Sequence, residues 1–131
     1  MIELVGDLGS GKTTLVQGVL AGLGFRGEVP SPTFTLERVY PVLQNRKAYH
    51  LDFYRLDGSD IVTEELAEIM GDPQNIVMVE WAGNGKVQLP PGRIRIDLRA
   101  EAKENERRVT VQSLGGAGMN VIKGLQNVYC A

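Results

Sequence analysis

Residues 6–14 have the residue types and the spacing that suit the binding of a nucleotide phosphate. Gly6, Gly11, Lys12 and Thr13 match the pattern G-x-x-x-x-G-K-[ST]. The glycines allow backbone N–H groups to converge on phosphate oxygens. Lys12 can carry positive charge to the outer phosphates, and the Thr13 hydroxyl suits Mg²⁺. The pattern predicts a phosphate-binding loop, and the alternative is a Gly-rich turn with an unrelated lysine.

Two acidic residues follow segments that read as strands. Glu80 comes after residues 76–79, a continuous apolar run typical of a strand buried on both sides in a parallel sheet. Such a strand can hold a carboxylate beside the loop as an anchor for Mg²⁺. Asp52 ends another predicted strand, where it could order a metal-bound water or orient the attacking water. The alternatives are a solvent-facing Glu80 and an Asp52 that only solubilises a strand end.

Residues close to Asp52 are open to two interpretations each. Period-2 alternation puts His50 and Tyr54 on the same face as Asp52. His50 by itself is interpreted as a hydrogen-bonded structural histidine rather than as a ligand or base. Arg55 either neutralises phosphate charge or pairs with Glu37.

Two further features have equally open roles. Trp81 follows Glu80 and belongs either to the core or to the site. Residues 31–35, Ser-Pro-Thr-Phe-Thr, put hydroxyl groups on a Pro-stiffened loop soon after the phosphate loop. NTPases keep a switch segment at that place, and the alternative is a simple loop with Pro at a strand entry.

Hydrophobic periodicity predicts the elements that position these residues. A strand over residues 1–5 delivers the loop, and a helix over residues 13–23, ended by Gly24, leaves it. The rest of the chain predicts a hairpin of strands over 33–40 and 48–54, a helix over 61–70, strands over 76–79, 93–99 and around 109–111, a charged connection over 101–108 and a helix over 121–129. This is an α/β fold whose mixed sheet carries the loop, Asp52 and Glu80 at one strand edge.

Composition limits the class of protein. A chain of 131 residues with 43% apolar residues is expected to form one domain over residues 1–131 and is neither collagenous nor disordered. With a formal net charge of −2, the chain lacks the excess positive charge that is typical of proteins that bind nucleic acid by themselves. The single cysteine, Cys130, excludes an internal disulfide and a cysteine zinc cage. Apolar runs of strand length and the Gly-rich start predict a cytoplasmic protein with no membrane association.

Four blocks of the sequence together resemble the bacterial TsaE family, formerly called YjeE. They read GDLGSGKTT at residues 6–14, SPTFTLERVY at 31–40, HLDFYRL at 50–56 and VEW at 79–81. The family reads G-D-L-G-[AS]-G-K-T-T, S-P-T-[FY]-T-L, H-x-D-x-Y-R-L and E-W in the same order. Agreement in four blocks across nearly the whole chain is far more specific than the phosphate loop alone.

The resemblance implies a P-loop NTPase-like fold and a weak ATPase that uses ATP and Mg²⁺. Such a protein serves the bacterial machinery that installs threonylcarbamoyl on tRNA adenosine (t6A), with TsaD and TsaB as partners and tRNA contacted only through the complex. Thr13 and Glu80 would hold Mg²⁺, Thr33 would act as the switch, and Asp52 and Trp81 would also serve the site. The phosphates would be held by Gly9, Ser10, Gly11, Lys12, Thr13 and Thr14.

One departure from the family concerns the start of the chain, since family members usually have a strand and a helix ahead of the phosphate-loop strand. The chain begins at Met1, so we expect an exposed sheet edge and an uncovered apolar face beside that strand, with self-association through the edge. Two other functions stay open. One is a small P-loop kinase with Arg93, Arg95, Arg99 and Arg107–Arg108 as the candidate lid arginines, and the other is a non-catalytic nucleotide-binding module.

Overall fold

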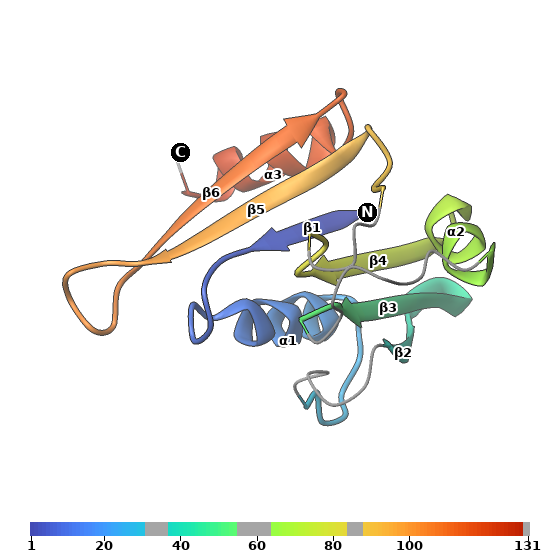
Figure 1. Cartoon of the computed structure of the whole chain (residues 1–131), viewed down its shortest axis with the longest axis horizontal. Coiled ribbons are helices and arrows are strands. Elements are labelled where there is room, and N and C mark those ends of the chain that lie inside the picture. Colours follow the sequence, from blue (N-terminus) through green and yellow to red (C-terminus); the bar gives the residue numbers. More distant parts are fainter. Residues whose placement is uncertain (31–36, 55–63, 84–87, 130–131) are drawn as a thin grey trace.

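Six strands form one mixed sheet in the order β2-β3-β4-β1-β5-β6 (Figure 1). The computed structural model describes residues 1–30, 37–54, 64–83 and 88–129. The strands β3, β4, β1 and β5 are parallel, and β2 and β6 pair antiparallel at the two sides. The strand bounds are β1 (Ile2–Val5), β2 (Glu37–Val42), β3 (Arg46–Asp52), β4 (Asn75–Glu80), β5 (Arg93–Ala100) and β6 (Arg107–Leu114).

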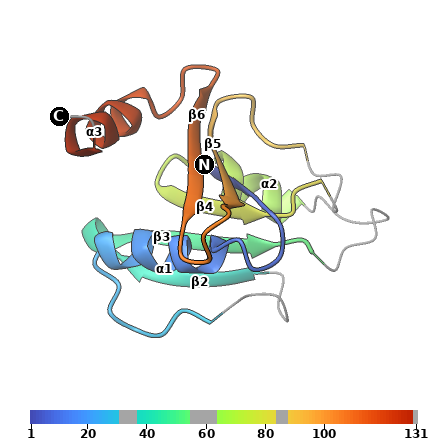
Figure 2. The same ribbon diagram turned by 90° about the vertical axis from the view of Figure 1, so that its left-hand side faces the viewer.

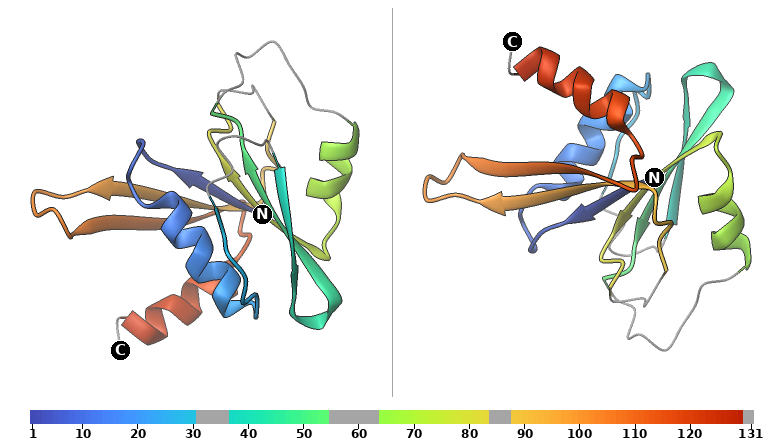
Figure 3. Two further views of the ribbon diagram at one scale, coloured as in Figure 1. Left: turned by 90° about the horizontal axis from the view of Figure 1, so that it is seen from below. Right: turned by 90° about the horizontal axis from the view of Figure 1, so that it is seen from above.

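The three α-helices of the described residues lie on the two faces of the sheet (Figure 3). Helix α1 (Lys12–Gly22) and helix α3 (Met119–Tyr129) lie on one face, and α2 (Glu64–Gly71) lies on the other. Figure 2 shows α3 projecting away from the sheet beyond β6. Within the described ranges, no helix is long and apolar enough to cross a membrane.

The parallel strand β4 is buried on both sides, as its continuous apolar run predicts. Met78 belongs to the cluster under α1, together with Leu4 and Val16. Val77 and Val79 belong to the cluster under α2 on the other face. This burial on both faces makes β4 a rigid support for the residue at its end, Glu80.

The predicted element types are confirmed where the structure describes them, with shifts at some ends. The β2–β3 hairpin is present, and the strand expected over 48–54 ends at Asp52. There the Asp52 Oδ1 atom accepts a hydrogen bond of 2.9 Å from the Tyr54 N–H, an Asx-type turn that competes with strand pairing. Arg107 and Arg108 lie in β6 rather than in the charged connection. The first parts of the strand over 33–40 and of the helix over 61–70 lie outside the described residues.

The strand that leads into the phosphate loop has no exposed edge, so that expectation is wrong. β1 lies in the middle of the sheet and pairs in parallel with β4 on one side and β5 on the other. The face opposite α1 is open as a cleft beside β1, and alternation along β1 and β5 puts Glu3, Arg95 and Asp97 on it together with the apolar Val5. Self-association stays a prediction.

Candidate nucleotide site

The loop between β1 and α1 has a backbone that only glycine supports well at two points. Gly9 and Gly11 have φ of 75° and 105°, in the region that side chains disfavour. Gly6 is required for space, because a Cβ there would lie 2.5 Å from Ser10 Oγ and 2.7 Å from the Leu98 carbonyl oxygen. The loop is therefore folded tightly against the end of β5.

The start of α1 suits an anion. Gly11 offers no capping side chain, and the first turn contains no acidic residue. The first N–H groups of a helix have no partner within the helix, and the helix dipole adds positive potential there. The buried Ser10 Oγ also has no hydrogen-bond partner among the described residues. These features fit the phosphate group that the motif predicts.

Lys12 is buried at the centre of this loop. Its ammonium donates hydrogen bonds to the carbonyl oxygens of Gly6, at 2.7 Å, and Asp7, at 2.8 Å. Burial lowers the pKa of Lys12 from its ordinary value, while the nearby carboxylates of Glu80, Asp52 and Asp7 act in the opposite direction. The lysine thus stands among three acidic side chains from three different segments.

Glu80 and Asp52 meet at the ends of neighbouring parallel strands. The two residues are register partners, and both are buried. The Phe53 N–H donates to the Glu80 carbonyl oxygen at 3.1 Å, which continues the pairing one residue further. Because paired residues share a face of the sheet, both carboxyl groups are on the α1 face, where Lys12 begins the helix.

His50 lies on the same face, one pleat before Asp52. It is fully buried, and its Nε2 atom is hydrogen-bonded to Glu80 Oε2. The expected hydrogen bond of His50 is therefore present, and the ring is buried. The identity of its partner was not predicted, because the contact joins residues that are 30 apart in the chain.

Trp81 covers the lysine from the end of β4. Its φ of 58° turns the chain sharply after Glu80. The Lys12 Nζ atom lies 4.7 Å from the centre of the Trp81 ring, a cation–π distance. The ring also lies near that of Tyr54, with ring centres 5.0 Å apart. Trp81 thus lies beside Lys12 and also at the margin of the core cluster under α2.

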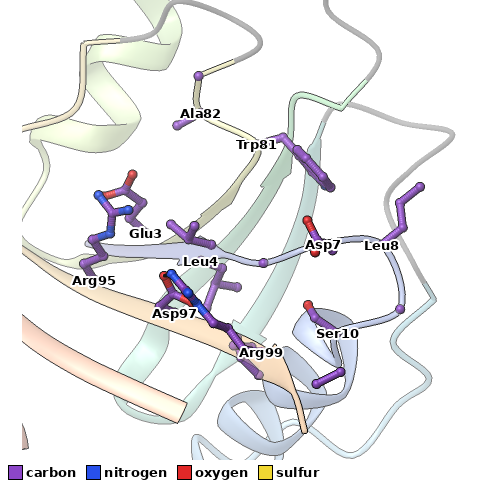
Figure 4. Close-up of a pocket in the computed structure, with 16 residues that line it drawn as sticks. Glu3, Leu4, Asp7, Leu8, Ser10, Trp81, Ala82, Arg95, Asp97 and Arg99 are labelled. Atoms are coloured by element: carbon purple, nitrogen blue, oxygen red, sulfur yellow. Dashed lines mark hydrogen bonds and ion pairs between the residues drawn. The ribbon is translucent and has the colours of Figure 1, made fainter. Parts of the chain in front are cut away.

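A cleft of about 640 Å³ extends from the phosphate loop across β1 (Figure 4). Trp81, Asp7 and Ser10 lie at the loop end, and a group of four charged side chains from β1 and β5 lies toward the other end. The charged end was missed by motif reasoning, since alternation on β1 and β5 was its only signal. Its charged members are Glu3, Arg95, Asp97 and Arg99.

The structure brings most of the predicted site residues together at one edge of the sheet. The loop residues Gly9–Thr14, Asp52, Glu80 and Trp81 come from the C-terminal ends of β1, β3 and β4. Asp7, which contacts Lys12 through its carbonyl oxygen, was not singled out from the sequence. Thr33, Arg55 and the remainder of the switch segment lie outside the described residues.

The candidate lid arginines lie in regular strands rather than in a loop, although Arg95 and Arg99 line the cleft. Arg93 donates to Glu3 at 2.8 Å, Arg99 to Asp97 at 3.1 Å, and Arg108 pairs with Glu101 at 2.6 Å. They lie on β5 and β6, within regular strands. This arrangement gives no support to the kinase alternative.

Comparison with known proteins agrees with the geometry. A family model described as threonylcarbamoyl adenosine biosynthesis protein TsaE matches residues 1–109. The tRNA threonylcarbamoyladenosine biosynthesis protein TsaE of Streptomyces coelicolor is 42% identical, over 88% of this chain and 80% of its own. The protein of the same name from Haemophilus influenzae is 36% identical, over 97% of this chain and 78% of its own.

A solved structure extends the similarity to the fold. The crystal structure of Bacillus subtilis YdiB superposes with a TM-score of 0.78 and 31% identity, over 97% of this chain and 76% of that one. The predicted P-loop NTPase-like α/β fold is confirmed. The match of the family model over most of the chain and the identity to relatives over 78% and 80% of their length lead to one conclusion: this chain belongs to the TsaE family.

Proposed function

We propose that this protein is the ATP-binding, weakly hydrolysing component of the bacterial machinery that makes threonylcarbamoyladenosine in tRNA. One observation carries the proposal: the phosphate loop, Lys12 and the carboxylates of Asp52 and Glu80 meet at one edge of the sheet. Ligands of open α/β sheets bind at the carboxyl ends of the strands. The names of the relatives in Streptomyces coelicolor and Haemophilus influenzae supply the tRNA product.

In this proposal the nucleotide phosphates are held by residues 9–14. The tight turn at Gly9 and Gly11 and the uncapped start of α1 support this role. Lys12 exchanges its carbonyl partners, Gly6 and Asp7, for the outer phosphates. The exchange is favourable because a phosphate oxygen carries more negative charge than a carbonyl oxygen.

Thr13 and Glu80 are the proposed protein ligands of Mg²⁺, with Asp52 beside them. When bound, Mg²⁺ would neutralise charge on the phosphates. Hydroxyl and carboxylate oxygens are the donors that this cation prefers. The positions of Glu80 and Asp52 support the proposal, because both carboxyl groups are buried at the ends of neighbouring strands, on the face of the sheet where Lys12 begins α1.

We further propose that residues 1–131 form one ATPase domain that acts in the cytoplasm with homologues of TsaD and TsaB. Thr33 is the proposed sensor of the outer phosphate, and Trp81 contributes to the nucleotide site. Contact with tRNA is made only through the complex. A non-catalytic role remains the second candidate, since a binding module would use the same loop and the same cation.

The test is ATP binding and phosphate release by the purified full chain with Mg²⁺, alone and with its TsaB and TsaD homologues. We expect ATP binding by the isolated chain, slow phosphate release, and a change in release when both partners are added. Binding without phosphate release in either setting would favour the non-catalytic module. Absence of ATP binding would overturn the proposal.

A further inference from the structure

We propose that His50 is a positioning residue that holds Glu80 ready for the divalent cation. This inference rests on the proposed function, because it assigns Mg²⁺ to Glu80. It adds a residue from β3 whose side chain would act only through another side chain. The basis is the contact between His50 Nε2 and Glu80 Oε2, which joins two buried groups on neighbouring strands.

The first step of the argument is burial. His50 has no exposed surface, and the Glu80 side chain is 4% exposed. A buried polar group is costly without a hydrogen bond. His50 Nδ1 has no partner among the described residues, so Nε2 makes the only side-chain hydrogen bond that the structure gives this ring. The pair is therefore the main polar contact of His50.

The second step concerns the two oxygens of Glu80. In the described part of the chain, the side-chain hydrogen bond of Glu80 uses Oε2. The other oxygen, Oε1, makes no hydrogen bond that the described residues show. A glutamate has three side-chain torsions, and a hydrogen bond to one oxygen restricts all three. The contact therefore orients the carboxylate before a cation arrives.

The third step is the position of the pair relative to Lys12. Glu80 ends β4 directly before Trp81, whose ring centre lies 4.7 Å from Lys12 Nζ, so the pair stands beside the phosphate loop. His50 is one pleat further from the strand ends than Asp52 and is held within β3. Partners that orient a metal ligand in this way typically contribute 10-fold to 100-fold in metal affinity.

The experiment uses four full-length variants and a fluorescent N-methylanthraniloyl ATP. In His50→Gln, the side-chain amide N–H can take the position of the histidine Nε2–H. In His50→Asn, the shorter side chain puts the amide N–H near the position of Nδ1 instead. His50→Ala removes the donor. Leu51→Ala is the matched control, because Leu51 is equally buried on β3 but belongs to the cluster on the opposite face. Melting temperature, nucleotide affinity in EDTA and the Mg²⁺ concentration that gives half-maximal tightening of binding are measured for each variant.

We expect His50→Ala and His50→Asn to need about 10-fold or more Mg²⁺, with nucleotide affinity in EDTA unchanged. His50→Gln should stay close to wild type, and Leu51→Ala should lower the melting temperature without moving the Mg²⁺ requirement. The proposal is overturned if His50→Gln and His50→Asn need the same Mg²⁺ concentration, or if nucleotide affinity falls equally with Mg²⁺ and in EDTA. It is also overturned if all three His50 variants fail to fold while Leu51→Ala folds.

Adding Glu80→Gln as a fifth variant separates this inference from the proposed function. If the wild-type chain binds no nucleotide, the proposed function fails first. If wild type binds nucleotide with a Mg²⁺ requirement that Glu80→Gln raises and His50→Ala does not, only the role of His50 is overturned.

Discussion

The ammonium group of Lys12 lies 4.7 Å from the centre of the Trp81 ring. This contact joins the first residue of α1 to the residue that follows β4, so it depends on the pairing of β1 with β4. It also puts the one tryptophan of the chain beside the lysine that is expected to bind phosphate. Charge on Lys12 is therefore coupled to the environment of the indole.

The first prediction follows from this contact. ATP binding should change the emission of Trp81, because Lys12 must leave the carbonyl oxygens of Gly6 and Asp7 when it turns to the phosphates. Tryptophan emission is measured during titration with ATP. Emission that stays constant while calorimetry records binding would show that Lys12 keeps its position. Lys12→Ala should show no ATP-dependent change.

Lys12→Ala should weaken ATP binding by about 100-fold or more, since the triphosphate loses the fixed cation of the loop and its charge-assisted hydrogen bonds. Calorimetric titration measures the affinity. Lys47→Ala is the control, because Lys47 is an exposed lysine on β3. Equal affinities for wild type and Lys12→Ala would contradict the phosphate-loop assignment.

Glu80→Gln should leave nucleotide binding in EDTA measurable and reduce Mg²⁺-dependent phosphate release by at least about 10-fold. The amide keeps an oxygen for His50 but removes the negative charge that the cation needs. Glu3→Gln is the matched control, since Glu3 is a half-buried acid on β1 that pairs with Arg93 instead. Unchanged release by Glu80→Gln would move the metal role to Asp52.

Gly6→Ala should destabilise the protein by about 1–3 kcal/mol, because the added Cβ would meet the rigid carbonyl oxygen of Leu98 at 2.7 Å. Gly18→Ala should stabilise it by about 0.5–1 kcal/mol, since Gly18 is in α1 with nothing within 4 Å of an added Cβ. Urea unfolding of both variants measures the free energies. Opposite signs are expected, and a Gly6→Ala variant as stable as wild type would show that the loop can adjust to the added Cβ.

Tyr40→Phe should raise stability at alkaline pH. The buried Tyr40 hydroxyl has no hydrogen-bond partner among the described residues, and burial raises its pKa. The folded state therefore holds this proton more tightly than the unfolded state does. The stability that this tighter binding gives the wild type is fully present below the unfolded pKa of about 10, and it is lost as pH rises through the raised folded pKa. The difference in stability between Tyr40→Phe and wild type should therefore increase above pH 10.

Melting temperatures at pH 8 and above pH 10 test the Tyr40 prediction. Tyr49→Phe on β3 is the control, because Tyr49 is half-buried on the opposite face of the sheet. A gain that is the same at both pH values would show that the hydroxyl, and not its titration, decides the effect.

The sequence by itself determined the phosphate loop and the kinds of elements around it. Gly6, Gly11 and Lys12 act through a local backbone shape and the helix that follows, so their spacing is enough to identify them. The apolar run at residues 76–79 likewise indicates burial on both faces, because a strand with no solvent-exposed face shows no alternation of apolar and polar residues. The four family blocks identified the TsaE family for the same reason, since each is a short local pattern.

Tertiary structure decided the relations between residues that are far apart in the chain. The hydrogen bond of His50 to Glu80 needs the parallel register of β3 and β4, which no local pattern encodes. The central place of β1 was also missed, because β5 returns from residue 93 to pair with the side that was expected to be open. Strand order depends on how distant apolar faces pack together, so sequence periodicity predicted the strands but not their neighbours.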